Sequence, residues 1–322
     1  MAIYTKLSEN VLKEFFSKYN LGKLVNYNGI QDGIENTNYF VQTDKGKFIL
    51  TIYEKRVEEQ DLPFFMGLMR NLFDSNFPSP EPLINKNGNY ITEIANKKAA
   101  VVSFLNGSAK KILSPDNCNK VGIESAKLHM ITKNLKGKRE NRLSVDSWKK
   151  IYKKIKKDCT KIHPNLTNII EKNLQEIENS WPKNIPSGII HADLFPDNIF
   201  FKGNKLTGII DFYFSCHDFY AFEIAICLNA FCFEGKNENL SFNVTKAKKF
   251  IDGYSSIRKL SEEEKKSLKI LCQGAAMRFL LTRVFDFLNL TEGAIVKIKD
   301  PIEYLKRLEF HNSVKNYQDY FF

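Results

Sequence analysis

The sequence lacks long apolar segments and is poor in cysteine. No apolar run approaches the roughly 20 residues of a transmembrane helix, and the first ten residues show no signal-peptide pattern. The 6 cysteines form neither C-x-x-C pairs nor a zinc-ligand spacing. We therefore expect a cytoplasmic protein with reduced thiols and no membrane association.

Acidic residues are fewer than basic ones, with 37 Asp and Glu against 48 Lys and Arg, for a formal charge of +11. The lysines are spread along the chain. Their densest run, residues 149–157, alternates with apolar residues at helical spacing, as on a solvated amphipathic helix. A nucleic-acid surface is the alternative, but we expect no nucleic-acid partner. A basic balance also suits an enzyme that binds ATP and an anionic substrate.

The order of the expected elements predicts two domains. The 322 residues are 43% hydrophobic and 26% charged, which is ordinary for a globular chain. Strands are expected at 24–28, 37–43, 47–53, 89–94 and 98–104, with helices at 8–19 and 61–73. Helical patterns then dominate, at 115–130, 145–157, 165–181, 219–233 and 261–290. We predict an α+β fold, with a strand-rich nucleotide-binding lobe at 1–104 and a helical catalytic and acceptor-binding lobe at 105–322.

Four polar residues stand beside short apolar arms in the middle of the chain. His191, Asp193 and Asn198 precede one of them, residues 199–201, and Asp211 follows the other, residues 206–210. Asp193 could orient an attacking hydroxyl and accept its proton. A base followed by an amide and a carboxylate that bind metal is typical of phosphoryl transfer. The alternative is a polar turn between apolar strands with no catalytic role.

A hairpin is expected to bring two of these residues together. The arms 199–201 and 206–210 flank a Gly-Asn pair at 203–204, which is a turn signal. Folding at this turn would return Asp211 toward Asn198. A carboxylate and an amide oxygen there could share a hard cation such as Mg²⁺.

The loop between the first two strands is a candidate phosphate-binding loop. Its backbone N–H groups could bind phosphate oxygens. It lacks the G-x-G-x-x-G pattern of protein kinases, so a plain hairpin loop is the alternative. Its candidate residues are Gly29, Gly33, Asn36, Thr37 and Asn38.

Several segments together resemble a known family. They read Gly-Ile-Glu-Asn-Thr-Asn (33–38), Leu-Thr-Ile-Tyr-Glu-Lys-Arg (50–56), Asp-Leu-Pro-Phe-Phe (61–65), His-Ala-Asp-Leu-Phe (191–195), Ile-Asp-Phe-Tyr (210–213) and Met-Arg-Phe-Leu-Leu-Thr-Arg (277–283). They resemble the aminoglycoside phosphotransferase/choline kinase-like branch of the protein-kinase fold, and within it most closely the bacterial homoserine kinases. The likeness spans nearly the whole chain.

This resemblance implies a two-lobed protein-kinase-like fold that uses ATP and Mg²⁺. It implies L-homoserine as acceptor and O-phospho-L-homoserine as product, a step toward threonine. Asp193 would be the catalytic base, with His191 beside it, and Asn198 and Asp211 would be metal ligands. The loop at 29–38 would cover the phosphates. Backbone groups of the hinge, Ser103 to Leu105, would hold the adenine.

One position departs from the wider kinase pattern. Kinases of this fold have an ATP-binding lysine on the third strand, where this chain has Thr51. Lys55 has the strand parity of Thr51 and is a candidate substitute, so both are expected near the nucleotide. Asp61 is the nearest acidic candidate for the usual partner of that lysine.

Two arginines in the late apolar helix are candidate acceptor ligands. An unpaired buried guanidinium is costly. Arg283 has a possible local partner in Asp286, whereas Arg278 has none. We expect Arg278 to bind the homoserine carboxylate through two hydrogen bonds, with a long-range ion pair to Glu223 or Asp218 as the alternative. The candidate acceptor-binding set is Arg278, Arg283, Tyr213 and Glu223.

Two other functions are compatible with the same motifs. One is a kinase for another small alcohol, such as choline or an aminoglycoside. Choline needs aromatic or acidic surroundings, so the arginines favour an amino acid. The other is a catalytically inactive kinase-like scaffold, which the intact Asp193, Asn198 and Asp211 argue against. The oligomeric state is not predicted.

Overall fold

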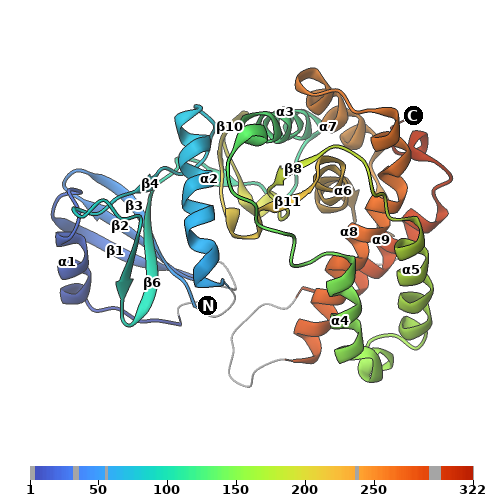
Figure 1. Cartoon of the computed structure of the whole chain (residues 1–322), viewed down its shortest axis with the longest axis horizontal. Coiled ribbons are helices and arrows are strands. Elements are labelled where there is room, and N and C mark those ends of the chain that lie inside the picture. The colour runs from blue at the N-terminus through green and yellow to red at the C-terminus, as the bar shows by residue number, and fades with distance from the viewer. Residues whose placement is uncertain (1–3, 32–35, 55–56, 236–238, 290–298, 322) are drawn as a thin grey trace. The chain divides into compact units, whose positions relative to one another are not determined.

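The computed structural model describes residues 4–31, 36–54, 57–235, 239–289 and 299–321 (Figure 1). The chain forms two compact units. The sheet unit comprises residues 1–108, 200–202 and 207–213, and the helical unit comprises residues 109–199, 203–206 and 214–322. The single boundary expected between residues 104 and 105 differs from this division, because parts of a later hairpin and the segment after it group with the sheet unit.

The sheet unit contains an antiparallel sheet with the strand order β1-β2-β3-β6-β4, and β5 also pairs with β6. Its strands are β1 (Leu24–Ile30), β2 (Thr37–Thr43), β3 (Gly46–Ile52), β4 (Pro82–Leu83), β5 (Ile91–Ile94) and β6 (Lys97–Ser103). Its helices are α1 (Glu9–Ser17), η1 (Glu59–Asp61) and α2 (Leu62–Asp74). Every strand and helix expected before residue 105 is therefore present, with shifts of a few residues at the ends.

The sequence pattern explains how this unit packs. Burial alternates along β2, as expected for a strand with one face against the core. Helix α1 begins after Ser8, whose hydroxyl accepts the N–H of Val11 at 3.4 Å. Its Leu12, Phe15 and Phe16 lie on one face and are buried in the same core as the strands.

The helical unit carries most of the remaining elements. Its helices are α3 (Pro115–Ile131), α4 (Val145–Ile155), α5 (Leu166–Ser180), α6 (Tyr220–Phe231), α7 (Val244–Ile257), α8 (Glu262–Leu288) and α9 (Ile302–Ser313). Its 3-10 helices are η2 (Thr132–Asn134), η3 (Lys156–Lys161), η4 (Pro196–Asn198) and η7 (Tyr317–Tyr320), while η5 (Phe212–Phe214) begins in the sheet unit. Two ribbons are formed by β8 (Ser187–Ile190) with β11 (Cys216–Phe219) and by β12 (Phe233–Glu234) with β13 (Ser241–Phe242).

The expected hairpin is confirmed. Strand β9 (Ile199–Lys202) pairs with β10 (Lys205–Ile209) and with β7 (Ser108–Ala109). The turn between β9 and β10 contains Gly203, whose φ of 59° lies in the left-handed region that glycine adopts without strain.

Two buried helices position the site described below. Helix α6 is buried on nearly all sides, as its apolar composition predicts, and the buried set includes Glu223 and Asn229. Helix α8 begins with the expected capping box, in which Ser261 and Glu264 bond each other's backbone N–H. Arg278 lies in the buried middle of α8. Both helices therefore carry ionisable or polar side chains into the interior.

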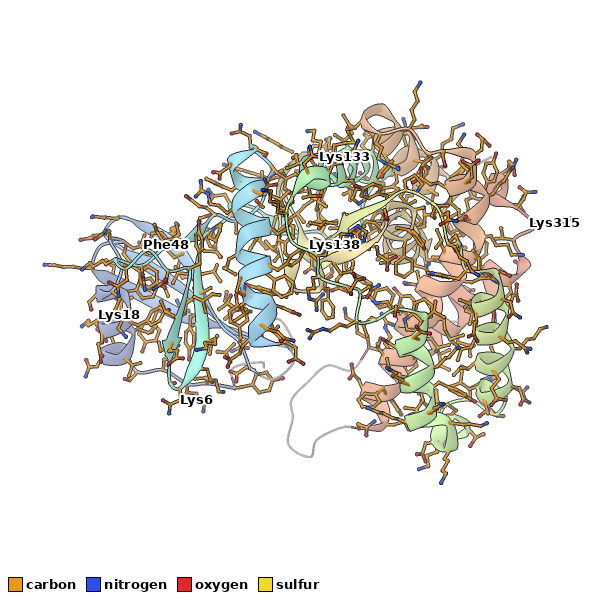
Figure 2. The ribbon with its side chains drawn as sticks, viewed as in Figure 1. Lys6, Lys18, Phe48, Lys133, Lys138 and Lys315 are labelled. Atoms are coloured by element: carbon orange, nitrogen blue, oxygen red, sulfur yellow. The ribbon has the colours of Figure 1, made fainter. Side chains whose placement is uncertain are left out.

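The cysteines lie in the interior of the protein, and lysines lie on both units. The 6 cysteines all lie in described segments and are free and buried. Figure 2 shows lysines on both units, with Lys6 and Lys18 on the sheet unit and Lys133, Lys138 and Lys315 on the helical unit. Within the described residues, no helix is long and apolar enough to cross a membrane.

Candidate active site

The loop at residues 191–198 carries the candidate base Asp193, and we call it the catalytic loop. It leaves the β8–β11 ribbon through a strained residue. Ile190 is the last residue of β8 and pairs with Cys216 of β11. Ala192 then adopts a φ of 64°, a left-handed conformation that non-glycine residues rarely adopt. Such conformations persist only where surrounding contacts determine them, and they concentrate at functional sites.

Two buried charged side chains supply those contacts. The Glu223 Oε2 of α6 accepts the backbone N–H of His191 and, at 3.0 Å, that of Ala192. The Arg278 Nη1 of α8 donates to the carbonyl of Ala192 at 2.6 Å. Glu223 and Arg278 are each only 1% exposed to solvent. Glu223 and Arg278 thus hold the peptide groups on both sides of Ala192.

Other residues of the loop are hydrogen-bonded to the backbone of Asp193. The carbonyl of Asp193 accepts the Phe195 N–H at 3.0 Å and the Asn198 Nδ2 at 2.9 Å. The Asp193 N–H donates to Nδ1 of His191 at 3.3 Å. Because the Asn198 amide nitrogen is oriented inward, its Oδ1 remains as an oxygen donor for a cation. The Asp193 side chain is partly exposed, so it can meet a substrate.

Charge and burial set the protonation of Glu223. Burial raises the pKa of Glu223 to about 7, although hydrogen bonds from the backbone of Ala192 and His191 and the charge of Arg278 act in the opposite direction. The carboxylate of Asp193 raises this pKa further, which places it near Glu223. Burial also raises the pKa of Tyr304, and the charge of Asp193 adds to that effect as well.

Three expected site residues of the helical unit are buried. Arg278 and Glu223, the candidates to contact the acceptor, bind the backbone of the catalytic loop, and their contact with an acceptor stays a prediction. His191 is 0% exposed, so it supports the loop from within and is not available to a substrate. The physical reason is shared: a buried polar or charged group needs a partner, and the loop backbone provides it.

Arg283 is also engaged within the protein. Its Nη1 donates to the Asp300 carbonyl at 2.8 Å and to Glu303 at 2.9 Å. Its guanidinium lies 4.4 Å from the ring centroid of Tyr304. Glu303 is therefore an ion-pair partner where the sequence suggested Asp286.

The sheet unit contributes a second set of residues, linked by hydroxyl groups. Thr51 Oγ1 donates to Asn38 Oδ1 at 2.8 Å, and the Tyr53 hydroxyl donates to that of Tyr213 at 3.1 Å. We call these two hydrogen-bonded pairs, Thr51 with Asn38 and Tyr53 with Tyr213, the hydroxyl network. Thr51, the residue at the position where the resemblance expects a lysine, lies on β3.

Aromatic packing fixes this network beside Asp211. The Tyr213 ring packs edge-on against Tyr53 and Phe65, with centroids 5.2 Å and 5.6 Å away. Burial raises the pKa of Tyr213 to about 12, and the nearby Asp211 carboxylate contributes to that rise. Asp211 is exposed and has a φ of 66°. Tyr213 is half-buried and its hydroxyl accepts a hydrogen bond from Tyr53, so its acceptor-binding role stays a prediction.

The expected phosphate loop is described only in part. Gly33 and Lys55 lie outside the described residues. Gly29 pairs with Tyr39 across the β1–β2 ladder. Asn36 and Thr37 are buried, and their side chains bond Glu54: Asn36 Oδ1 accepts its N–H at 3.4 Å and Thr37 Oγ1 donates to its Oε1 at 2.6 Å. These two side chains therefore stabilise the loop's end.

The expected hinge has one uncommitted backbone donor. The N–H of Ser103 donates to Glu81 at 2.9 Å, and the N–H of Phe104 donates to Lys47 at 3.2 Å. Among the hydrogen bonds of the described segments, none uses the N–H of Leu105. Of the hinge positions, Leu105 is thus the one with a donor available for a nucleotide base.

The donor set fits a hard cation bound mainly through a substrate. In the described parts of the chain, no group of three or more His, Cys, Asp or Glu side chains could hold a metal by itself. The candidates, Asn198 and Asp211, offer one amide oxygen and one carboxylate. Both are hard oxygen donors of the type Mg²⁺ uses when phosphates complete its coordination.

Comparison with known proteins identifies the class. A profile described as "Phosphotransferase enzyme family" matches residues 26–258. Among solved structures, an amicoumacin kinase in complex with AMP-PNP and Ca²⁺ superposes with a TM-score of 0.71 at 14% identity, covering 97% of this chain and 95% of that one. A spectinomycin phosphotransferase bound to ADP and spectinomycin gives a TM-score of 0.66 at 12% identity, with 98% of both chains covered. The chain belongs to this phosphotransferase family, and the predicted protein-kinase-like α+β fold is confirmed.

Sequence relatives narrow the class to one branch. The chain is 45% identical to a homoserine kinase of Xanthobacter autotrophicus over 320 residues, which cover 99% of each chain. It is 43% identical to a homoserine kinase of Agrobacterium fabrum, covering 99% of this chain and 98% of the relative. The chain is a member of the homoserine kinase branch, as the sequence motifs indicate.

Sequence reasoning missed Tyr53 and the anchoring roles of Glu223 and Arg278. A signal for Tyr53 was present, because it lies two residues after Thr51 and therefore on the same face of the strand. No local signal pairs Glu223 or Arg278 with the catalytic loop, since each contact spans more than 30 residues.

Proposed function

We propose that the protein transfers the γ-phosphoryl group of ATP to the side-chain hydroxyl of L-homoserine, forming O-phospho-L-homoserine for threonine biosynthesis. The observation that carries this proposal is the 45% identity to a homoserine kinase over 99% of the chain. The intact catalytic loop around Asp193 supports an active enzyme. The unpaired cysteines favour the cytoplasmic location expected from the sequence.

Asp193 is the proposed catalytic base. It follows the strained Ala192. The backbone N–H and carbonyl of Asp193 are hydrogen-bonded within the loop, and the residue is partly exposed. It would orient the homoserine hydroxyl and accept its proton as the bond to phosphorus forms. Glu223, Arg278 and His191 are positioning residues that hold the loop from the interior.

Asn198 and Asp211 are the proposed ligands of Mg²⁺. The cation, when bound with ATP, neutralises charge on the phosphates. Asn198 offers its Oδ1 because its Nδ2 bonds the Asp193 carbonyl at 2.9 Å. Asp211 offers a carboxylate on an exposed residue whose backbone is in the left-handed conformation.

The nucleotide is proposed to bind the sheet unit through backbone and neutral groups. The free N–H of Leu105 is suited to the adenine edge, and the loop that starts at Gly29 is suited to the phosphates. The Thr51 position bears a hydroxyl where other kinases have a lysine. We propose that the hydroxyl network fixes this strand and the Asp211 segment without an added charge.

A panel of acceptors tests the proposed reaction. ADP release should be measured with L-homoserine, L-serine, choline and kanamycin at equal concentrations, with Mg²⁺ and ATP fixed. The proposal predicts that kcat/KM is highest for homoserine and that phosphate appears on its side-chain oxygen. Preference for choline or kanamycin would identify another small-alcohol kinase. No turnover with tight nucleotide binding would identify an inactive scaffold.

A further inference from the structure

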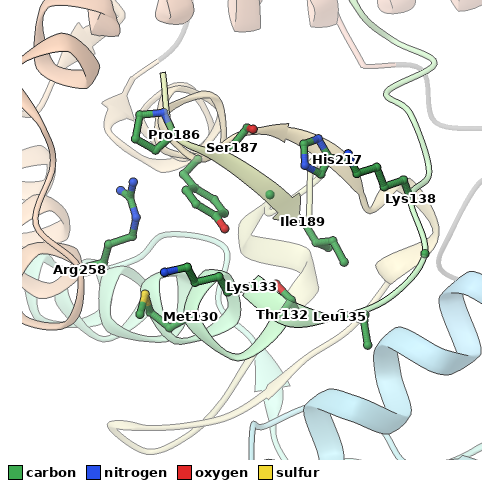
Figure 3. Close-up of a pocket in the computed structure, with 13 residues that line it drawn as sticks. Met130, Thr132, Lys133, Leu135, Lys138, Pro186, Ser187, Ile189, His217 and Arg258 are labelled. Atoms are coloured by element: carbon green, nitrogen blue, oxygen red, sulfur yellow. The ribbon is translucent and has the colours of Figure 1, made fainter. Parts of the chain in front are cut away.

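The helical unit contains a cavity of about 420 Å³ that the proposed reaction does not use. Its lining comes from β8, from the end of α3 with the segment after it, and from His217, Tyr220 and Arg258. Figure 3 shows this lining, with Tyr220 unlabelled. Its lining comes only from residues of the helical unit. The volume lies in the range of small-molecule sites, roughly 300–1,000 Å³.

The charge of the lining has one sign. Lys133, Lys138, His217 and Arg258 line the cavity, and no Asp or Glu does. Arg258 is already neutralised by Glu264, with Nη2 and Oε1 2.9 Å apart. Lys133 and Lys138 are exposed and have no ion pair or hydrogen bond within the described segments. Two uncompensated cations therefore face one cavity, which favours an anionic ligand.

A tyrosine hydroxyl at the cavity wall adds a directional donor. Tyr220 lines the cavity and is 7% exposed, yet its hydroxyl has no hydrogen-bond partner in the described parts of the chain. The ring is fixed by stacking with His129, at 4.5 Å between centroids, and by Arg258, at 4.6 Å from the ring centroid. Gly188 leaves room for this arrangement, because a Cβ there would collide with the Tyr220 hydroxyl. This hydroxyl is therefore available to a ligand oxygen in the cavity.

We propose that this cavity binds a small phosphate-bearing anion, either inorganic phosphate or a phosphomonoester. A phosphate group carries up to two negative charges and three strong acceptor oxygens. The cavity offers two unpaired ammonium groups, a tyrosine hydroxyl and the ring N–H of His217. This match of charge and donor number favours phosphate over a single carboxylate. The product of the proposed reaction, O-phospho-L-homoserine, is itself a phosphomonoester. Its role as the ligand of this cavity depends on the proposed function.

The position of the cavity connects it to the catalytic loop. Residues 187–189 of β8 line the cavity, and the same strand continues into His191. Tyr220 is the first residue of α6, and Glu223, one turn later, holds the N–H groups of His191 and Ala192. A ligand that bonds Tyr220 and orders this wall therefore affects the loop that carries Asp193, so it should change turnover as well as bind.

The test separates this cavity from the active site. Inorganic phosphate and O-phospho-L-homoserine are titrated calorimetrically into enzyme saturated with AMP-PNP, Mg²⁺ and homoserine. The test variant is Lys133→Gln/Lys138→Gln. The matched control is Lys153→Gln/Lys157→Gln, which makes the same charge change at exposed lysines of the same unit that do not line the cavity.

We expect one site in the wild type and the control, and affinity about tenfold weaker in the test variant, from loss of two exposed charge contacts. Tyr220→Phe should weaken binding about threefold through the lost hydrogen bond. Binding of both probes indicates a general phosphate site, and binding of the ester alone indicates product recognition. Equal affinity in wild type and test variant, or no saturable binding by either probe, overturns the proposal. If phosphate still binds the cavity but the acceptor panel shows no turnover of homoserine, the proposed function is wrong and the cavity proposal stands.

Discussion

The candidate residues fall into two halves, one in each unit, that are held by opposite kinds of polar contact. In the sheet unit, neutral hydrogen bonds join Thr51 to Asn38 at 2.8 Å and Tyr53 to Tyr213 at 3.1 Å. In the helical unit, a buried carboxylate and a buried guanidinium hold the backbone of the catalytic loop. A neutral hydrogen bond contributes about 0.5–1.5 kcal/mol, whereas removing one partner of a buried charged set costs about 3–5 kcal/mol. The comparison teaches that the catalytic loop is the more vulnerable half.

The largest effect is expected at the reacting group itself. Asp193→Asn should lower kcat by roughly 10²–10⁴-fold, because a general base contributes that much. The dissociation constant of Mg·ATP, measured by calorimetry, should change little, since Asp193 acts on the acceptor hydroxyl. Asp197→Asn is the control, because Asp197 is on the same loop and exposed. A variant that keeps more than half of the wild-type kcat would remove Asp193 from the mechanism.

Next in size is the loss of the buried guanidinium. Arg278→Met should lower the free energy of unfolding by about 3–5 kcal/mol and reduce kcat, because the buried Ala192 carbonyl loses its charged donor and Glu223 loses a nearby positive charge. Urea unfolding and steady-state kinetics measure the two effects. Arg283→Met, on the same helix but paired with the more exposed Glu303, should cost less. A strong rise in homoserine KM with unchanged stability and kcat would show that Arg278 contacts the acceptor.

Glu223 provides a dependence on pH. Burial raises its pKa from 4.5 to about 7, so the folded state retains a proton that the unfolded state has lost between these values. Stability of the wild type relative to Glu223→Gln should therefore fall as pH rises from about 4.5 to 7, by up to about 3 kcal/mol. Urea unfolding of both proteins at several pH values measures this difference. A constant difference would mean that Glu223 titrates normally.

The smallest effect is expected in the hydroxyl network. Tyr213→Phe should cost about 0.5–1.5 kcal/mol, seen as a two- to tenfold rise in the KM for ATP with kcat largely retained. Tyr27→Phe is the control, because no hydrogen bond of its hydroxyl occurs in the described part of the sheet unit. A loss of kcat as large as that of Asp193→Asn would contradict the contrast between the two halves.

Much of this architecture was accessible from the sequence. Local patterns predicted the hairpin, α6, the capping box of α8 and the motif residues around Asp193, because each depends on neighbours in the chain. Helices α7 and α9 were not predicted, although α9 shows helical spacing of its buried Tyr304, Leu305, Leu308 and His311.

The remaining features depend on contacts that no local pattern encodes. The apolar surroundings of Arg278 predicted its burial, but not that its partner would be a carbonyl 86 positions away. The left-handed Ala192 was also hidden, because alanine gives no signal for that conformation. The sequence could therefore show that a buried charge needs a partner, without showing that the partner is the catalytic loop.

One measurement tests most directly whether Glu223 and Arg278 act as a unit on that loop. A double-mutant cycle of Glu223→Gln and Arg278→Met is followed by urea unfolding at pH 8. Both residues approach Ala192, and the charge of Arg278 lowers the pKa of Glu223, so the two substitutions should not be additive. The account predicts that the double variant is more stable than the summed single effects allow, by about 1–3 kcal/mol. Additivity within about 0.5 kcal/mol would contradict it.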